Sequence, residues 1–205
     1  RNGTVKKTVL KDYSNIRKTG VIAILLDEGD DLISVCLTDG EDNVLLATHE
    51  GKAIRFAEED VRTMGRVTRG VRGIRLAEED YVVGMCLQRD GADLLTVTEK
   101  GYGKRTAPEE YRLQTRGGKG ISNYNITEKT GKVAAIRMAA EGEDVLLVTS
   151  GGIIMRTKVE EISRLSRSTQ GVRVVRLADQ ITVIDMAGAA REEEVSEGEE
   201  ETAEE

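Results

Sequence analysis

The sequence predicts an all-β, propeller-like fold made of four repeats of about 50 residues, arranged as blades around an axis. Three observations lead to this prediction. A short apolar run that ends in Thr recurs at residues 44–48, 94–98 and 145–149. A glycine lies three residues after each of these Thr residues, at Gly51, Gly101 and Gly152. A second glycine, always followed by a β-branched residue, recurs at Gly20, Gly70, Gly120 and Gly171.

Each repeat is predicted to form four antiparallel strands. The apolar run and the glycine turn after it are typical of a hairpin. Its second arm, such as residues 51–56, alternates in polarity as a half-buried strand does. A third strand is expected after the second glycine. The fourth is the apolar run at 32–37, 82–87, 133–138 or 181–186, and acidic turns such as 27–31 and 78–80 precede it.

The period divides the chain into a β domain, residues 1–190, and a tail, residues 191–205. The repeats cover about residues 1–40, 41–91, 92–142 and 143–190. The first repeat lacks the apolar run that ends in Thr, so its blade should be incomplete, and we expect the chain to be cut within a blade, with further blades upstream. The tail contains nine Glu and one Arg. It has almost nothing apolar to bury and should be disordered.

Composition excludes several classes of protein. No apolar stretch approaches the roughly 18 residues of a membrane helix. One His and two Cys cannot form a zinc site without several carboxylates. Trp is absent and Phe occurs once, which argues against a surface that stacks unpaired bases. The two Cys, without a signal peptide, indicate a reducing compartment and no disulfide framework.

Charge is sorted within each repeat. From the first glycine to the residue after the second, the four segments have net charges of +4, +2, +3 and +2, although residues 1–190 as a whole carry only +1. Equivalent positions of a radial fold lie on one ring. A ring of Lys and Arg with few aromatic residues is typical of a surface that binds the phosphates of duplex DNA. An ordinary solvated face is the alternative for any single charge run.

The most distinctive local motif is Gln114-Thr115-Arg116-Gly117-Gly118-Lys119-Gly120. Its glycines would let backbone N–H groups approach an anion, and its two cations would attract phosphate. It is not a nucleotide-binding P-loop, because Gly120 follows the Gly-Lys pair where Ser or Thr is required. A glycine-rich turn with incidental charges remains the alternative.

These motifs resemble the C-terminal domain of the DNA gyrase A subunit. The resemblance covers essentially all of residues 1–190 and rests on this motif and on residues 2–10, 51–56, 68–76, 101–106 and 156–163. It implies a β-pinwheel, a disc whose blades exchange strands with their neighbours. The family's disc has about six blades, a normal number for a radial fold. Its Gln-Arg-Arg-Gly-Gly-Lys-Gly box normally lies in the first blade. Here the closest match has Thr115 at the second position and lies in the third repeat, so these repeats resemble the last four blades, with a second, box-like motif.

The resemblance also implies a function. Duplex DNA would bend around the basic rim, so that a gyrase holoenzyme introduces negative supercoils with ATP hydrolysed by the gyrase B protein. The expected partners are double-stranded DNA, a second copy of the gyrase A chain and the gyrase B subunit, in the bacterial cytoplasm and associated with the nucleoid. The isolated domain is expected to be monomeric, without a membrane partner. No cofactor or metal is expected on this chain, since ATP and Mg²⁺ act elsewhere in the holoenzyme, and the catalytic tyrosine lies outside it.

The residues expected to neutralise phosphates on the rim, without reading bases, are Lys6, Lys7, Lys11, Arg17, Lys18, Lys52, Arg55, Arg66, Arg69, Lys104, Arg105, Arg116, Lys119, Arg156, Arg164 and Arg167. Two alternatives stay open: the equivalent domain of topoisomerase IV, and a protein-binding β-propeller scaffold. The scarcity of aromatic anchors disfavours the scaffold.

Other residues are expected to be structural. Cys36 and Cys86 share a repeat position with Ile136 and Met186 and are predicted to be core thiols. His49 is expected in a solvated turn. The acidic pairs at 58–59, 109–110 and 160–161 recur in phase, which favours a role in a turn over a metal site. No enzyme active site is predicted.

Overall fold

The computed structural model describes residues 1–191, and all of its regular elements are strands and short 3₁₀ turns. Three hairpins form the centre of the fold, as the repeat predicts. They are β2 (Asn43–Thr48) with β3 (Lys52–Ala57), β6 (Ala92–Thr98) with β7 (Tyr102–Thr106), and β10 (Asp144–Thr149) with β11 (Ile154–Lys158). Gly51 and Gly101 adopt φ of +75° and +77°, which explains why glycine ends each turn.

In the last three repeats, the fourth strand returns to the first strand of its own hairpin. These inner strands are β5 (Val82–Leu87), β9 (Val133–Ala140) and β13 (Val183–Ala189), and they pair antiparallel with β2, β6 and β10. The register shifts at the same point in all three pairs, next to the Thr that ends the hairpin strand. The register shift therefore recurs from repeat to repeat, as the strands themselves do.

The strand after the second glycine pairs with a neighbouring repeat. These two-residue strands are β4 (Val71–Arg72), β8 (Ile121–Ser122) and β12 (Val172–Arg173). They pair with β1 (Thr4–Val5), β3 and β7, which belong to the preceding repeats. The exchange of strands that the family resemblance implies is thus present in every neighbouring pair of repeats.

The second glycine is required by this exchange. A Cβ atom on Gly70, Gly120 or Gly171 would lie 2.5 Å from a carbonyl oxygen of the accepting strand, and each of the three has a positive φ. No real Cβ makes so short a contact. The spacing of these glycines therefore records where one repeat approaches the next.

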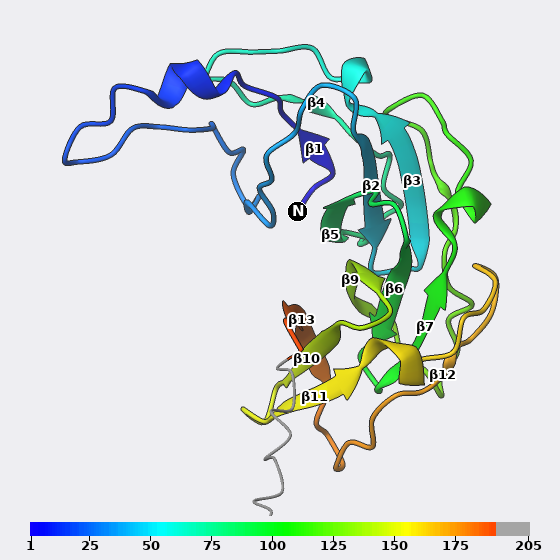
Figure 1. The fold of residues 1–205 in the computed structure, drawn as a ribbon. Helices are drawn as coiled ribbons and strands as arrows, with labels where there is room; N and C mark the ends of the chain where they lie inside the picture. The colour runs from blue at the N-terminus through cyan, green and yellow to red at the C-terminus, as the bar shows by residue number, and fades with distance from the viewer. Residues whose placement is uncertain (192–205) are drawn as a thin grey trace, which may run out of the picture.

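The blades follow one another along an arc (Figure 1). The inner strands β5, β9 and β13 lie on its concave side, and the outer strands β3, β7 and β11 lie toward the convex side with the connecting loops. The apolar core lies largely between the blades. One cluster joins Leu45 and Tyr111 with Leu94 and Ile136, and a second joins Leu95 with Leu147 and Met186.

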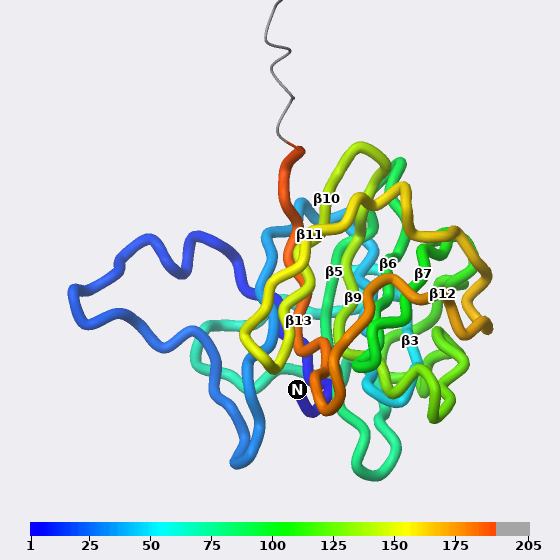
Figure 2. The backbone as a smooth tube through the Cα atoms, turned by 90° about the horizontal axis from the view of Figure 1, so that it is seen from below, coloured from blue at the N-terminus to red at the C-terminus, as the bar shows by residue number. Residues whose placement is uncertain are grey.

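The first repeat departs from the prediction. Residues 32–37 form no strand, and Cys36, expected in the core, is exposed. In the other repeats this strand pairs with the apolar run that ends in Thr. The first repeat has no such run, so its inner strand has no partner. Residues 6–42 instead form the long excursion visible in Figures 1 and 2, with only the 3₁₀ turn η1 (Leu10–Tyr13). The predicted incomplete first blade is confirmed as the two-stranded sheet β1–β4.

The last blade is also open. Two blades have the predicted four strands, and the sheet β11–β10–β13 has three. Within residues 1–191, no strand pairs with the outer edge of β11. Ile154 is consequently 61% exposed, whereas Ala53 at the equivalent position of β3 is fully buried. The tail is predicted to be disordered, but all of its residues except Arg191 lie outside the described part of the structure. Among the described residues, no helix has the length and apolar character of a membrane span.

The two cysteines should differ sharply. Cys86 lies opposite Leu45 in a core cluster, and burial raises the pKa of its thiol to about 12. Cys86→Asp should lower the free energy of unfolding by about 3 kcal/mol or more, because it buries an unpaired carboxylate. Cys36→Asp should change it by less than about 0.5 kcal/mol. Urea unfolding of both variants tests this, and equal losses would contradict the exposed position of Cys36.

Candidate nucleic-acid interface

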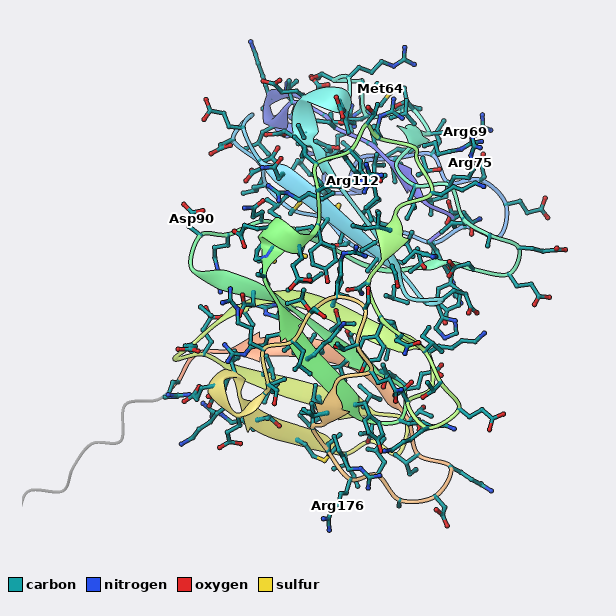
Figure 3. The ribbon with its side chains drawn as sticks, turned by 90° about the vertical axis from the view of Figure 1, so that its right-hand side faces the viewer. Met64, Arg69, Arg75, Asp90, Arg112 and Arg176 are labelled. Atoms are coloured by element: carbon teal, nitrogen blue, oxygen red, sulfur yellow. The ribbon has the colours of Figure 1, made fainter. Side chains whose placement is uncertain are left out.

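The predicted basic segments form loops on the convex side of the arc (Figures 1 and 3). We call residues 58–70, 108–120 and 159–171 the rim loops. Each begins with a 3₁₀ turn that contains one of the acidic pairs: η2 (Glu58–Asp60), η3 (Pro108–Glu110) and η4 (Val159–Glu161). The prediction that these acidic pairs belong to a structural turn is therefore confirmed.

The Arg that recurs four residues after the first glycine supports the neighbouring rim loop. Arg55 donates through Nη1 to the carbonyls of Pro108 and Tyr111, at 3.1 and 3.2 Å. Arg105 donates through Nε to the carbonyl of Ile162 at 2.7 Å. Lys7, the counterpart in the first repeat, donates to the carbonyl of Glu58 at 3.0 Å. These cations donate hydrogen bonds to backbone carbonyls in or just after the next 3₁₀ turn. The sequence did not reveal this role.

Arg105 and Arg156 are further committed to acidic partners. Arg105 is 7% exposed and also lies near Glu141 and the buried Asp93, with N–O distances of 3.2 and 3.7 Å. The prediction that Arg105 faces DNA is therefore wrong, because its charge is used inside the blade. Arg156 is exposed, and its Nε donates to Asp144 at 2.7 Å.

Lys104 and Lys6 also lie away from the rim surface. Lys104 has no exposed surface, so its predicted contact with DNA is wrong. Lys6 is half-buried and donates to the carbonyls of Ala23 and Arg66. Burial lowers the pKa of Lys104 to about 8, with the charge of Arg167 acting in the same direction and that of Glu110 opposing it.

Three predicted arginines connect successive rim segments. Arg66, Arg116 and Arg167 are half-buried, and each donates through Nη1 to the carbonyl two residues after the second glycine of the preceding repeat. The acceptors are Ile22, Arg72 and Ser122, respectively. A line of Arg–carbonyl hydrogen bonds thus runs along the rim. These side chains are only partly free to meet phosphate.

The Gly-rich motif is docked on the neighbouring repeat. The backbone N–H of Gln114 donates to the carbonyl of Arg55 at 2.8 Å, and that of Gly117 donates to the carbonyl of Gly73 at 2.7 Å. Gly117 and Gly120 have positive φ, which accounts for glycine at both positions. Since the Gly117 N–H is already bonded, it is not available to a phosphate. Thr115 and Lys119 remain exposed on the surface of the motif.

The outermost cations are the best candidates for contact with DNA. The predicted residues that are exposed are Lys11, Arg17, Lys18, Lys52, Arg69, Lys119, Arg156 and Arg164. Arg69 pairs with Asp27 at 2.6 Å, and Arg164 pairs with Asp93 at 3.1 Å. No ion pair within residues 1–191 involves Lys119, Lys52, Lys11, Arg17 or Lys18.

The predicted set omits six exposed arginines that lie in or just after the rim loops. Arg62 and Arg112 occupy one repeat position, and the others lie two and five residues after a second glycine: Arg72, Arg75, Arg173 and Arg176. Figure 3 shows Arg69, Arg75, Arg112 and Arg176 on the convex side. Their regular spacing was the available signal. Four of the six lie beyond the residue after the second glycine, where the predicted basic segment ends, whereas Arg62 and Arg112 lie within it.

Two other clusters are structural. His49, expected to be solvated, stacks on Tyr81 with ring centroids 4.4 Å apart and contacts Glu99 through Nε2 at 3.0 Å. Its predicted solvation is therefore wrong. Carboxylates of Asp39, Asp42 and Glu58 meet within 4.8 Å, and Lys7 lies 3.7 Å from Glu58. Burial alone would raise the pKa of Glu58, but hydrogen bonds from residues 38–42 and the charge of Lys7 lower it.

Comparison with known proteins identifies the family. A family model described as the DNA gyrase C-terminal domain, a beta-propeller, matches residues 1–36, 42–85, 92–139 and 143–180. This chain belongs to that family. It is 59% identical over 179 residues to the DNA gyrase A protein of Halalkalibacterium halodurans, covering 87% of this chain and 22% of that protein. It is 43% identical over 189 residues to the DNA gyrase A protein of Escherichia coli K12, covering 92% of this chain and 22% of that protein. The chain thus spans about a fifth of the gyrase A proteins that it matches.

Solved structures agree with this gyrase assignment. A DNA gyrase A C-terminal domain aligns with a TM-score of 0.82 and 28% identity, covering 91% of this chain and 62% of that one. The C-terminal domain of a DNA topoisomerase IV aligns with a TM-score of 0.87 and 29% identity, covering 93% and 60%. The two folds are nearly equally similar, so the choice of gyrase rests on the higher sequence identity to gyrase A proteins.

We expect Arg55 to contribute to stability. Arg55→Met should lower the free energy of unfolding by about 1–3 kcal/mol, because two buried carbonyls of the next rim loop lose their donor. Arg112→Met, an exposed rim control, should change it by less than about 0.5 kcal/mol. Urea unfolding monitored by circular dichroism gives both values. An Arg55 variant as stable as the parent would show that this hydrogen-bonding arrangement is dispensable.

The lowered pKa of Lys104 predicts a pH dependence of stability. Its folded value of about 8 lies below the unfolded value of about 10.4. Between these values the unfolded chain binds more protons, so stability should rise with pH. The free energy of unfolding of the parent minus that of Lys104→Met should therefore increase from about pH 8 to about pH 10. Urea titrations across this range measure the difference, and a decrease would mean that the loop carbonyls favour the charged amine.

Proposed function

We propose that this domain binds duplex DNA along its convex rim and bends it, as part of a gyrase A protein. The single observation that supports the proposal best is the repeated placement of exposed Lys and Arg on successive rim loops, notably Arg62, Arg112 and Lys119. Phosphates recur along a duplex, and cations that recur along a curved surface neutralise them without reading bases. A bent duplex meets more of this surface than a straight one.

In the holoenzyme, the bound DNA would be presented to the cleavage site for negative supercoiling driven by ATP. The proposed partners are a second gyrase A chain and the gyrase B subunit, and the bacterial cytoplasm is the proposed location. These proposals follow from membership of the gyrase C-terminal domain family. The side chains described above support binding and bending, and the proposed role of this domain includes no bond-breaking step.

A protein-binding scaffold is the second candidate, and the aromatic residues disfavour it. Protein interfaces depend on exposed Tyr and Trp. Here Phe56 and Tyr111 are fully buried, and Tyr102 and Tyr124 are at most 6% exposed. Trp is absent from the sequence. A charged rim without aromatic anchors fits a phosphate backbone better than a protein partner.

A salt titration of DNA binding tests the proposal. The logarithm of affinity for a duplex of arbitrary sequence should fall linearly with the logarithm of salt concentration, with a slope of about −0.9 for each phosphate contact. Arg112→Ala and Lys119→Ala should each flatten the slope by about 0.9. Lys132→Ala is the control, because Lys132 pairs with Glu50 between hairpin turns, away from the rim loops.

Fluorescence anisotropy over a range of salt concentrations measures these slopes. Equal flattening by all three variants would place the DNA elsewhere. Affinity that does not change with salt would overturn the DNA proposal and leave the scaffold.

A further inference from the structure

Lys104 is buried directly beneath the rim loop 159–171. Its ammonium group donates to the carbonyls of Ser166, Arg167 and Thr169 at 2.8, 2.6 and 3.3 Å. An ammonium group has three N–H donors and no acceptor. The Thr169 hydroxyl oxygen also lies 3.4 Å from this nitrogen. One side chain of β7 therefore bonds to three backbone carbonyls of the following repeat.

The surroundings hold this arrangement in place. The Tyr124 ring lies 4.9 Å from the Lys104 nitrogen, and its hydroxyl donates to the carbonyl of Gln170. The Thr169 hydroxyl donates to the carbonyl of Ser166 at 2.8 Å, within the same loop. Without the ammonium group, the carbonyl of Arg167 would lose its donor. The carbonyls of Ser166 and Thr169 would keep only the Thr169 hydroxyl and N–H and the Asn125 N–H, respectively. The loss of these bonds beneath the loop is costly.

The same position differs between repeats in an informative way. Lys6, its counterpart in the first repeat, donates to the carbonyl of Arg66, which is equivalent to Arg167. The second repeat has the fully buried Ile54 in this place. The loop above Ile54 is the Gly-rich one, and a Cβ on Gly118 would lie 3.6 Å from the Ile54 side chain. Two rim loops are therefore held by a lysine, and the Gly-rich loop is not.

We propose that Lys104 is a positioning residue, which fixes residues 166–170 so that Arg167 is presented along the path of DNA. It never touches DNA itself. This inference rests on the proposed function, since the position of the loop affects DNA binding only if DNA lies on the rim. The rim loops then differ in what supports them from below. Loop 159–171 is held by Lys104, whereas loop 108–120 rests on the apolar side chain of Ile54.

Hydrogen exchange tests the local part of this proposal without DNA. Lys104→Met keeps the length of the side chain and removes its charge. At about pH 7, the amides of residues 165–170 should exchange about tenfold faster or more, while those of residues 115–120 keep the rates of the parent. Ile54→Met is the matched control and should leave residues 165–170 unchanged. Unchanged exchange in Lys104→Met, or acceleration in all loops alike, would overturn the proposal.

Coupling in DNA binding tests the remainder. In the parent, Arg167→Ala should flatten the salt slope by up to about 0.9. In the Lys104→Met background, the same change should have clearly less effect, because the Arg167 carbonyl is no longer held by the ammonium group. Equal effects in both backgrounds would overturn the positioning role. A merely structural role would lower the melting temperature without this coupling.

The two proposals can fail separately. If the parent does not bind the duplex in a salt-dependent way, the proposed function fails and hydrogen exchange still decides whether Lys104 holds the loop. If Lys104→Met does not fold, Lys104→Gln retains an amide donor and should show the same exchange pattern in a weaker form. Parent rates at residues 165–170 in that variant would overturn the proposal.

Discussion

The short exchanged strand is the interaction on which the rest of this structure depends. In each neighbouring pair of repeats, the two residues that follow the second glycine form a short strand. This strand pairs with the outer strand of the preceding repeat. The glycine is required because the strands approach so closely that a Cβ would strike a carbonyl. This contact fixes where each rim loop begins and ends. Where residues 1–191 supply no partner strand, at residues 32–37 and beside β11, apolar side chains such as Val35 and Ile154 are exposed.

Buried and half-buried cations also link neighbouring repeats, by hydrogen bonds to the carbonyls of the loops. Arg55 and Arg105 satisfy the carbonyls of the next 3₁₀ turn, and Lys104 satisfies those of the next rim loop. Each link joins one repeat to its neighbour, so stability should depend on nearest-neighbour interfaces, as in other repeat proteins. The core clusters have the same character, since Leu45 and Leu94 of successive hairpins share one cluster.

The basic character of each repeat therefore has two physical origins. Some cations are internal and exchange solvation for backbone carbonyls, and others remain in water on the convex side. Only the second group can contribute to a salt-dependent attraction for phosphate. A net charge counted along the sequence adds the two groups together, which is why it overstates the charge that the rim can offer.

The sequence by itself determined the period, the hairpins, the inner strands of the complete repeats, and the family. These features are local: an apolar run, a glycine at a turn and a fixed spacing are each visible within a few residues. It also located the basic segments and the acidic 3₁₀ turns.

Tertiary structure alone decided which cations face solvent. Lys104 and Lys119 are both basic residues of the same segment, so the sequence does not distinguish them. Lys104 lies beneath a loop of the following repeat, and Lys119 lies exposed on the rim loop of its own repeat. Tertiary structure likewise decided that Cys36 is exposed and Cys86 is not. Equivalent positions are equally buried only when each has a strand beside it, and pairing between distant segments is not written in either segment alone.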